Sequence, residues 1–206
     1  PHRVPPHCVN YRANMWALKE AGAEQVLAVS AVGGITEAYA PGTLAVSDQL
    51  VDFTWGRQHT YHDSPDVPLV HVDFTHPYGG PLRERLLQAA KAASVEVLDG
   101  GCIGVFQGPR LESAGEIRMA RGAGCDMAGM TSLPEAGLAR ELGIDYAGLA
   151  VVSNWGAGVH DELISEDDIA ETLREPMARV RQLLAALVAE SVGGNQHQHR
   201  AQALAA

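Results

Sequence analysis

The chain has 206 residues, of which 46% are hydrophobic and 19% are charged, an ordinary balance for a globular protein. This length favours one domain with one sizeable core. No run of 18 apolar residues occurs, which excludes a membrane-spanning helix in this sequence. The formal net charge of −10 argues against a nucleic-acid partner, because that affinity depends on basic side chains. A small anionic substrate remains compatible, since a few backbone amides bind an anion locally.

Cys8, Cys102 and Cys125 are too far apart in sequence for a CxxC motif. Three cysteines are also too few for a disulfide framework, so we expect free thiols and a cytoplasmic protein. The chain begins without Met, its first residues show no signal-peptide pattern, and it leads directly into a helical pattern. We therefore expect that a natural N-terminal part precedes residue 1.

The first 80 residues predict a helix, short strands and a long loop. Apolar residues recur at helical spacing over 9–22, and the continuous apolar run 26–29 is typical of a strand buried on both faces. Residues 30–34 are small and predict a turn after that strand. Further short strands are expected at 44–46 and 50–53. Residues 54–80 contain four histidines and little periodicity, which indicates a functional loop.

The rest of the chain alternates helices with strands, which predicts an α/β fold. Ser165 is expected to cap the last helix, and Pro176 to kink it. The domain is expected to span 1–192, with a disordered polar tail at 193–206. Helices are expected at 81–93, 113–122 and 134–142, and strands at 95–98, 102–106, 126–129 and 146–152.

Ligands of α/β sheets bind at the carboxyl ends of strands, so four segments attract attention. These segments are 30–34, 106–113, 129–132 and 153–158.

Ser30 lies in the first of these segments. Its hydroxyl and the small neighbouring residues suit an anion held by backbone N–H groups. The alternative is a tight strand–helix turn. The spacings GxGxxG and GxxxxGK[ST] are absent, so neither a dinucleotide fold nor a P-loop is predicted.

Four further residues have both a functional and an ordinary interpretation. Glu112 either accepts a ligand N–H or is a solvated charge at a helix start. Met130 either packs on a flat ligand or fills the core, and Thr131 either donates to an anion or caps a helix. Asn154 offers amide donors and an acceptor at the end of a buried strand, although Asn is also common in turns.

The histidines do not predict a metal site. His59, His62, His71 and His76 lie in one acidic loop, without the firm elements that metal ligands require. The nucleophile elbow GxSxG is also absent.

Taken in order, these segments resemble the trimeric purine nucleoside phosphorylase and methylthioadenosine phosphorylase family. The similarity covers about residues 2–190, and is greatest to the branch that acts on S-methyl-5'-thioinosine. The family implies a phosphorylase/hydrolase-like three-layer α/β sandwich with a mixed sheet, a homotrimer, and inorganic phosphate as co-substrate without a cofactor. The matching motifs are VNYRANMWALKEAG, AVSAVGG, QGPRLES, GMTSLPEAGLARELG and LAVVSN.

The resemblance assigns roles to individual residues. Ser30, Ala31 and Thr131 match phosphate-binding positions. Met130 matches the residue beneath the sugar and base, and Leu111 stands where relatives often have Phe against the purine.

Glu112 and Asn154 match the pair that recognises 6-oxopurines, with Asn154 as the catalytic donor to the leaving base. His71 falls where a neighbouring subunit contributes near the 5' group.

Two departures from the family pattern affect the expected activity. The family's first phosphate loop and its Arg-His pair would lie upstream of residue 1, together with a strand of the sheet. Trp155 and Gly156, which belong to the matched substrate segment, replace the Tyr and Asp of adenine-specific relatives. Residue 156 is therefore unable to act as an acid.

The expected reaction is phosphorolysis of S-methyl-5'-thioinosine to hypoxanthine and S-methyl-5-thioribose 1-phosphate, in purine nucleoside salvage. The alternatives are a methylthioadenosine phosphorylase, an inosine/guanosine phosphorylase, a nucleosidase that uses water, an inactive fragment of such an enzyme, and an unrelated binding module.

Overall fold

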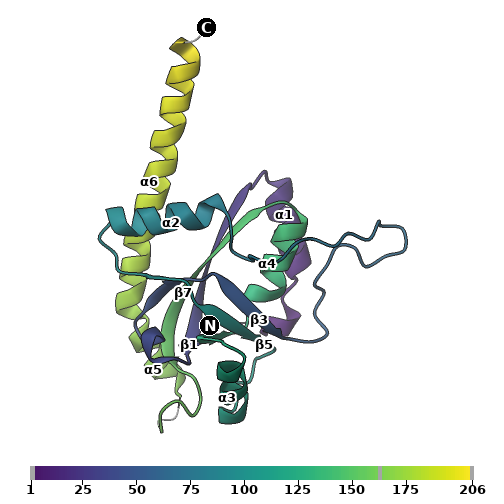
Figure 1. Ribbon diagram of the computed structural model, residues 1–206, viewed down its shortest axis with the longest axis vertical. Coiled ribbons are helices and arrows are strands. Elements are labelled where there is room, and N and C mark those ends of the chain that lie inside the picture. The colour runs from purple at the N-terminus through teal and green to yellow at the C-terminus, as the bar shows by residue number, and fades with distance from the viewer. Residues whose placement is uncertain (1–2, 162–163, 205–206) are drawn as a thin grey trace.

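The computed structural model describes residues 3–161 and 164–204, with side chains up to residue 190 apart from that of Glu166. It contains a seven-stranded mixed sheet covered by helices on both faces (Figure 1), in the order β3-β5-β6-β1-β7-β2-β4. The expected α/β sandwich with a mixed sheet is confirmed. The strands are β1 Gln25–Gly34, β2 Leu44–Val46, β3 Gln49–Phe53, β4 Leu98–Asp99, β5 Cys102–Phe106, β6 Met127–Gly129 and β7 Asp145–Trp155. The α-helices are α1 Tyr11–Glu20, α2 Pro81–Ala92, α3 Ala114–Gly122, α4 Ser132–Glu141, α5 Glu166–Thr172 and α6 Arg174–Leu204, and two 3₁₀ turns are η1 Pro6–Cys8 and η2 Glu37–Tyr39.

Strands β1 and β7 form the centre of the sheet. They run parallel, and their register extends from Gln25 opposite Asp145 to Gly34 opposite Trp155. On its other side β1 pairs with β6 only at Gly33 and Gly34, and there the two strands are antiparallel. Because β5 is parallel to β6, both of these strands run against β1 and β7. The carboxyl ends of the strands therefore do not share one edge.

Apolar side chains divide the core into layers on the two faces of the sheet. On one face, Met15 of α1 and Leu138 of α4 pack in a cluster with Val32 and Val152. On the other face, α2 and α6 cover Leu149 and its neighbours in β7. A smaller cluster under α3 includes Ile35 and Ile117. Residues of β7 are buried from both sides, which explains its continuous apolar sequence.

Three local expectations are corrected. Residues 30–34 do not form a turn, because they continue β1, and residues 153–155 continue β7. The reason is the parallel ladder, in which each strand supplies partners for the backbone groups of the other over its whole length. Residues 95–97, expected in a strand, lie outside one, and β4 is limited to Leu98 and Asp99.

The C-terminal helices show the expected cap at Ser165, and the helix is interrupted three residues before Pro176, where a kink was expected. The Ser165 side chain accepts from the Asp168 amide and begins α5, and the helical segment is divided at Leu173. Pro176 lies in the first turn of α6, where the missing N–H is tolerated.

The backbone of α6 continues through residues 193–204, where a disordered tail was expected, and Figure 1 shows this end projecting beyond α2. Its Gln, Arg, Ala and Leu residues are compatible with a helix. The domain boundary at residue 192 stays a prediction. Within the described residues, no helix combines the length and apolarity needed to cross a membrane.

Candidate active site

The register of the central strands sets the length of the candidate site. Asn154 lies beside Gly33 in the β1–β7 ladder. Gly33 also faces Ala128, and because β6 is antiparallel, the chain after β6 runs back along β1 toward Ser30. Ser30 precedes Gly33 by three residues, about 10 Å along a strand. The predicted anion-binding residues and the predicted base-binding residues therefore lie at opposite ends of an elongated site.

Ser30 is half-buried, and its side chain makes no hydrogen bond within the described part of the chain. Its neighbours Ala28 and Val32, on the same face by strand alternation, pack in the cluster with α1 and α4. The backbone of Ser30 and Ala31 pairs with β7 on one side. On the other side, the pairing of β1 with β6 ends at Gly33 and does not extend to Ala31 or Ser30. Successive N–H groups of a strand point to opposite sides, so one of these two is open to an anion.

Thr131 immediately precedes α4 and is exposed. Its side chain makes no capping hydrogen bond, so the expected alternative of a capping threonine is not seen. The hydroxyl is available to an anion at the level of Ser30.

Met130, just before it, is packed tightly against Gly108. A Cβ added at residue 108 would lie 2.5 Å from Met130 Sδ, and the φ of 59° at Gly108 favours glycine there.

The segment 107–113 connects the two ends of the site. It begins beside Met130 and ends at Ser113, whose side chain accepts from Glu116 N, while Glu116 accepts from Ser113 N in a capping box. The charged residue at the start of α3 is therefore Glu116. This was the position that the ordinary interpretation gave to Glu112. Leu111 is 43% exposed and offers an apolar surface to a flat ligand.

Glu112 has a buried carboxylate oxygen, Oε1, without a hydrogen-bond partner within the described residues. Burial raises the pKa of Glu112 above its ordinary value of 4.5, and the nearby Glu116 adds to this effect. Leaving a buried acceptor unpaired is costly. A ligand N–H directed at Oε1 would remove that cost.

Glu112 and Asn154 lie at the same end of the site, because the residues that follow each of them in the chain are packed together. A Cβ on Gly158 would lie 2.5 Å from Ala114 Cβ, and one on Gly156 would lie 3.2 Å from Ile117 Cδ1. The start of α3 is therefore packed on the chain that follows β7.

The Asn154 amide is held by two contacts. Its Nδ2 donates to Trp155 O at 2.8 Å, and its Oδ1 accepts from the Ser153 hydroxyl at 2.7 Å. Since a carbonyl oxygen only accepts, the atom that faces Trp155 O must be the nitrogen. One N–H of the amide is then left to donate to a ligand. Asn154 is thus a donor at this end of the site, and its carbonyl is already in use.

A cavity of about 300 Å³ opens beside this end of β7, and Asn154, Trp155 and Gly156 line it. The Trp155 ring meets His160 edge to face, with centroids 4.7 Å apart. Gly156 is buried, and its N–H donates to Gly34 O at 2.7 Å. A second cavity, of about 260 Å³, lies near Gly80 and Tyr146 at the other end of β7 and includes none of the predicted site residues.

His71 is not brought to the other predicted residues. It is exposed in the segment between β3 and α2, which Figure 1 shows reaching away from the rest of the protein. In the described chain, no cluster of three or more His, Cys, Asp or Glu residues is placed to hold a metal ion.

Sequence reasoning missed two residues that organise the site. Ser153 orients Asn154, and its only signal is a second polar residue after an apolar strand. Arg57 is buried and donates to the segments after β5 and after β6. It lies in the irregular loop, where no periodic pattern distinguishes a buried arginine from a solvated one.

Comparison with known proteins identifies the family. The model of the phosphorylase superfamily matches residues 2–189. The chain belongs to this superfamily.

Two relatives illustrate the similarity. A protein of Xanthomonas campestris named probable S-methyl-5'-thioinosine phosphorylase is 51% identical over 172 residues, which cover 84% of this chain and 68% of that protein. The 6-oxopurine nucleoside phosphorylase of Pyrococcus furiosus is 39% identical over 192 residues, covering 91% and 72%. Among solved structures, methylthioadenosine phosphorylase from Schistosoma mansoni in complex with adenine has a TM-score of 0.84 at 33% identity, covering 90% of this chain and 72% of that one.

Proposed function

We propose that this phosphorylase-superfamily protein cleaves S-methyl-5'-thioinosine with inorganic phosphate, forming hypoxanthine and S-methyl-5-thioribose 1-phosphate. The observation that carries the choice of base is the pair of opposite hydrogen-bonding groups at one end of the site. Glu112 has a buried unpaired acceptor, and Asn154 has a free donor.

In this reaction a phosphate oxygen attacks C1', and the bond from C1' to N9 breaks. Positive charge develops on the sugar and negative charge on the purine. The Ser30 and Thr131 hydroxyls, with a free N–H of Ser30 or Ala31, suit the phosphate. Asn154 donates to N7 or O6 and stabilises the charge of the leaving base. The base ends protonated by the proton that hydrogen phosphate gives up, through solvent, as it becomes the sugar phosphate ester.

The selection of the base follows from matching donors with acceptors. A 6-oxopurine presents N1–H to the Glu112 carboxylate, and O6 and N7 to the Asn154 N–H. Adenine presents an acceptor at N1, which an ionised Glu112 would oppose. Mismatched buried polar groups allow discrimination of up to about 10⁴–10⁵.

The 5'-methylthio group is supported by the name of the relative from Xanthomonas campestris, and the 6-oxopurine base by the name of the one from Pyrococcus furiosus. The test uses the protein expressed from its complete open reading frame. Release of free base is followed from methylthioinosine, inosine, methylthioadenosine and adenosine, with and without phosphate. We expect phosphate-dependent release, fastest from methylthioinosine. Faster release from methylthioadenosine would contradict the roles of Glu112 and Asn154, and release without phosphate would indicate a hydrolase.

The proposal extends to a cytoplasmic homotrimer that uses phosphate as co-substrate and needs no cofactor, in which His71 reaches the 5' end of a neighbouring site. The exposure of His71 in a projecting segment supports this arrangement. Sedimentation velocity tests the trimer. A His71→Ala variant is expected to raise the KM of the nucleoside and leave that of phosphate unchanged.

A further inference from the structure

Arg57 is the buried cation of the candidate site. It is 8% exposed, and its guanidinium lies 5.7 Å from the centre of the Tyr11 ring. All five of its N–H bonds are directed at neutral carbonyl oxygens. Nε donates to Gln107 Oε1 at 3.2 Å, Nη1 to Met130 O at 2.8 Å and Leu133 O at 2.5 Å, and Nη2 to Phe106 O at 3.0 Å and Gln107 O at 2.9 Å.

These acceptors belong to two segments that are far apart in the sequence. Phe106 and Gln107 begin the segment that leads to Leu111 and Glu112, and Met130 directly precedes Thr131. One rigid side chain therefore sets the distance between the segment that offers the base acceptor and the segment that offers the phosphate donor. A planar fork of five donors suits this task better than a flexible ammonium.

The charge of Arg57 is also transmitted through a peptide group. The carbonyl of Met130 and the N–H of Thr131 belong to the same peptide, so a cation bound to the oxygen polarises the N–H on its other side. Because no carboxylate accepts from the guanidinium, the positive charge is not neutralised by a hydrogen-bonded partner. Burial lowers the pKa of Arg57 from its usual value, yet an arginine remains protonated in proteins.

We propose that Arg57 is a positioning residue for phosphorolysis, which holds the segments after β5 and β6 together and strengthens the phosphate-binding end with its charge. This inference rests on the proposed function, and acts through Met130, Thr131 and the 107–113 segment rather than by contact with substrate.

The test compares Arg57→Lys and Arg57→Gln in the complete protein with Arg83→Lys as the matched control. Arg83 also donates to two backbone carbonyls, Ser47 O at 3.0 Å and Val46 O at 3.1 Å, and it pairs with the Asp99 carboxylate as well. These contacts lie beside Leu149 near the middle of β7, away from Asn154. KM is measured separately for phosphate and nucleoside, together with kcat and amide hydrogen exchange.

We expect Arg57→Lys to raise both KM values about tenfold, because each segment loses an anchor. Arg57→Gln should raise the KM of phosphate further than Arg57→Lys does, since the charge is lost as well. Amide exchange should accelerate over 107–113 and 130–135 in both variants. Arg83→Lys should lower Tm without changing either KM, and added guanidinium should partly restore an Arg57→Ala variant.

Unchanged KM values in folded Arg57 variants that only melt earlier would overturn the inference. Faster amide exchange in only one of the two segments would also overturn it. If the glutamine variant fails to fold, the lysine variant still provides this measurement. An inactive wild-type protein would instead overturn the proposed function, and the exchange measurements would still decide the role of Arg57.

Discussion

The hydroxyl of Ser153 lies 2.7 Å from Oδ1 of Asn154, and this contact occupies the acceptor end of the amide. Ser153 is buried and also lies 3.2 Å from Val32 O. The amide is therefore prevented from turning its oxygen toward the ligand, and what it offers is an N–H.

Replacing Ser153 with Ala should weaken the selection of the base. Without the hydroxyl, only the contact with Trp155 O holds the Asn154 amide in its orientation, so the preference for 6-oxopurine over 6-aminopurine nucleosides should fall about tenfold. The ratio of kcat/KM for methylthioinosine and methylthioadenosine measures this effect. A Ser153→Thr variant keeps the hydroxyl and should retain the preference; an equal loss in both variants would count against this role.

Asn154→Asp should move the preference toward the 6-amino base. An ionised carboxylate accepts from the amino group of adenine and repels O6, so the kcat/KM ratio should change by about tenfold or more. Competition between methylthioinosine and methylthioadenosine in one reaction measures the change. An unchanged kcat/KM ratio would show that Asn154 does not recognise the base.

Glu112 should determine the acid limb of the pH–rate profile. In the proposed function its carboxylate form accepts N1–H, and its pKa is raised by burial, so kcat/KM should fall with decreasing pH at values above the ordinary glutamate pKa. Glu112→Gln should remove that limb and lower kcat/KM.

The same substitution should stabilise the protein. A raised pKa in the folded state means that stability is present below pH 4.5 and is lost as the pH rises through the folded pKa. At pH 7 the Glu112→Gln variant should therefore melt at a higher temperature than the wild type. A lower Tm together with an unchanged acid limb would contradict the buried-carboxylate interpretation.

Thr131→Val should weaken phosphate binding selectively. The variant keeps the shape but loses the exposed hydroxyl, so the KM of phosphate should rise about 10-fold to 100-fold, the effect of one hydrogen bond to a charged group. The KM of the nucleoside should change little. Thr131→Ser is the control, since it restores the hydroxyl, and equal increases in both KM values would refute a phosphate role.

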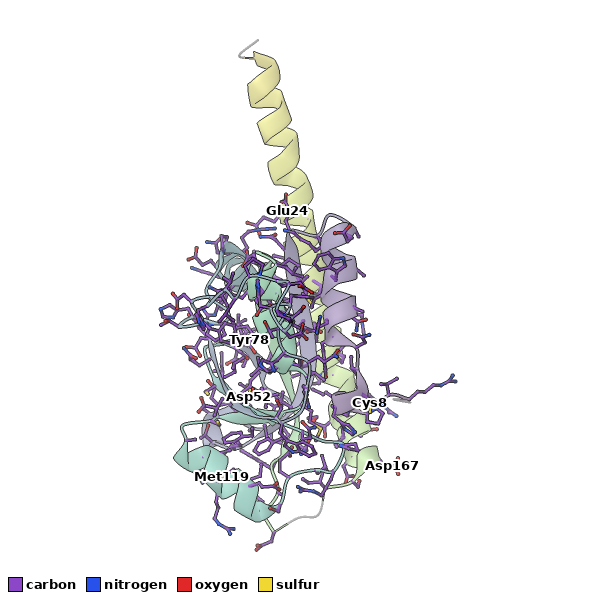
Figure 2. All side chains as sticks on the ribbon, turned by 90° about the vertical axis from the view of Figure 1, so that its right-hand side faces the viewer. Cys8, Glu24, Asp52, Tyr78, Met119 and Asp167 are labelled. Atoms are coloured by element: carbon purple, nitrogen blue, oxygen red, sulfur yellow. The ribbon has the colours of Figure 1, made fainter. Side chains whose placement is uncertain are left out.

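Tyr78 should make the protein sensitive to alkali. Figure 2 shows Tyr78 in the middle of the protein, and burial raises its pKa from 10.0 to about 12. The folded state holds this proton more tightly than the unfolded chain, so the free energy of unfolding should fall by about 2 kcal/mol between pH 10 and pH 12 from this group alone.

Tyr78→Phe should remove that part of the decline in denaturant titrations. At pH 7 it should cost little, because the Tyr78 hydroxyl is buried without a partner within the described residues. An identical alkaline decline in both proteins would show that Tyr78 does not contribute.

Local patterns predicted most of the helices and strands. The helical spacing at 9–22 identified α1, and the apolar run at 146–152 identified the buried strand β7. The same patterns predicted Ser30, Glu112, Thr131 and Asn154 at or near strand ends, which is wrong for Ser30 because it lies within β1. Their types were informative, because a hydroxyl, a carboxylate and an amide were out of place beside buried strands.

The sequence by itself determined the α/β class, the ordered motifs and the types of group proposed for the candidate site. The tertiary structure alone decided that β6 runs against β1, which places Thr131 level with Ser30 and separates them from Asn154. It also decided that Arg57 is buried between two distant segments. The physical reason is that periodicity reports which face of an element is buried, whereas strand direction and the partners of a loop arginine depend on residues far apart in the chain.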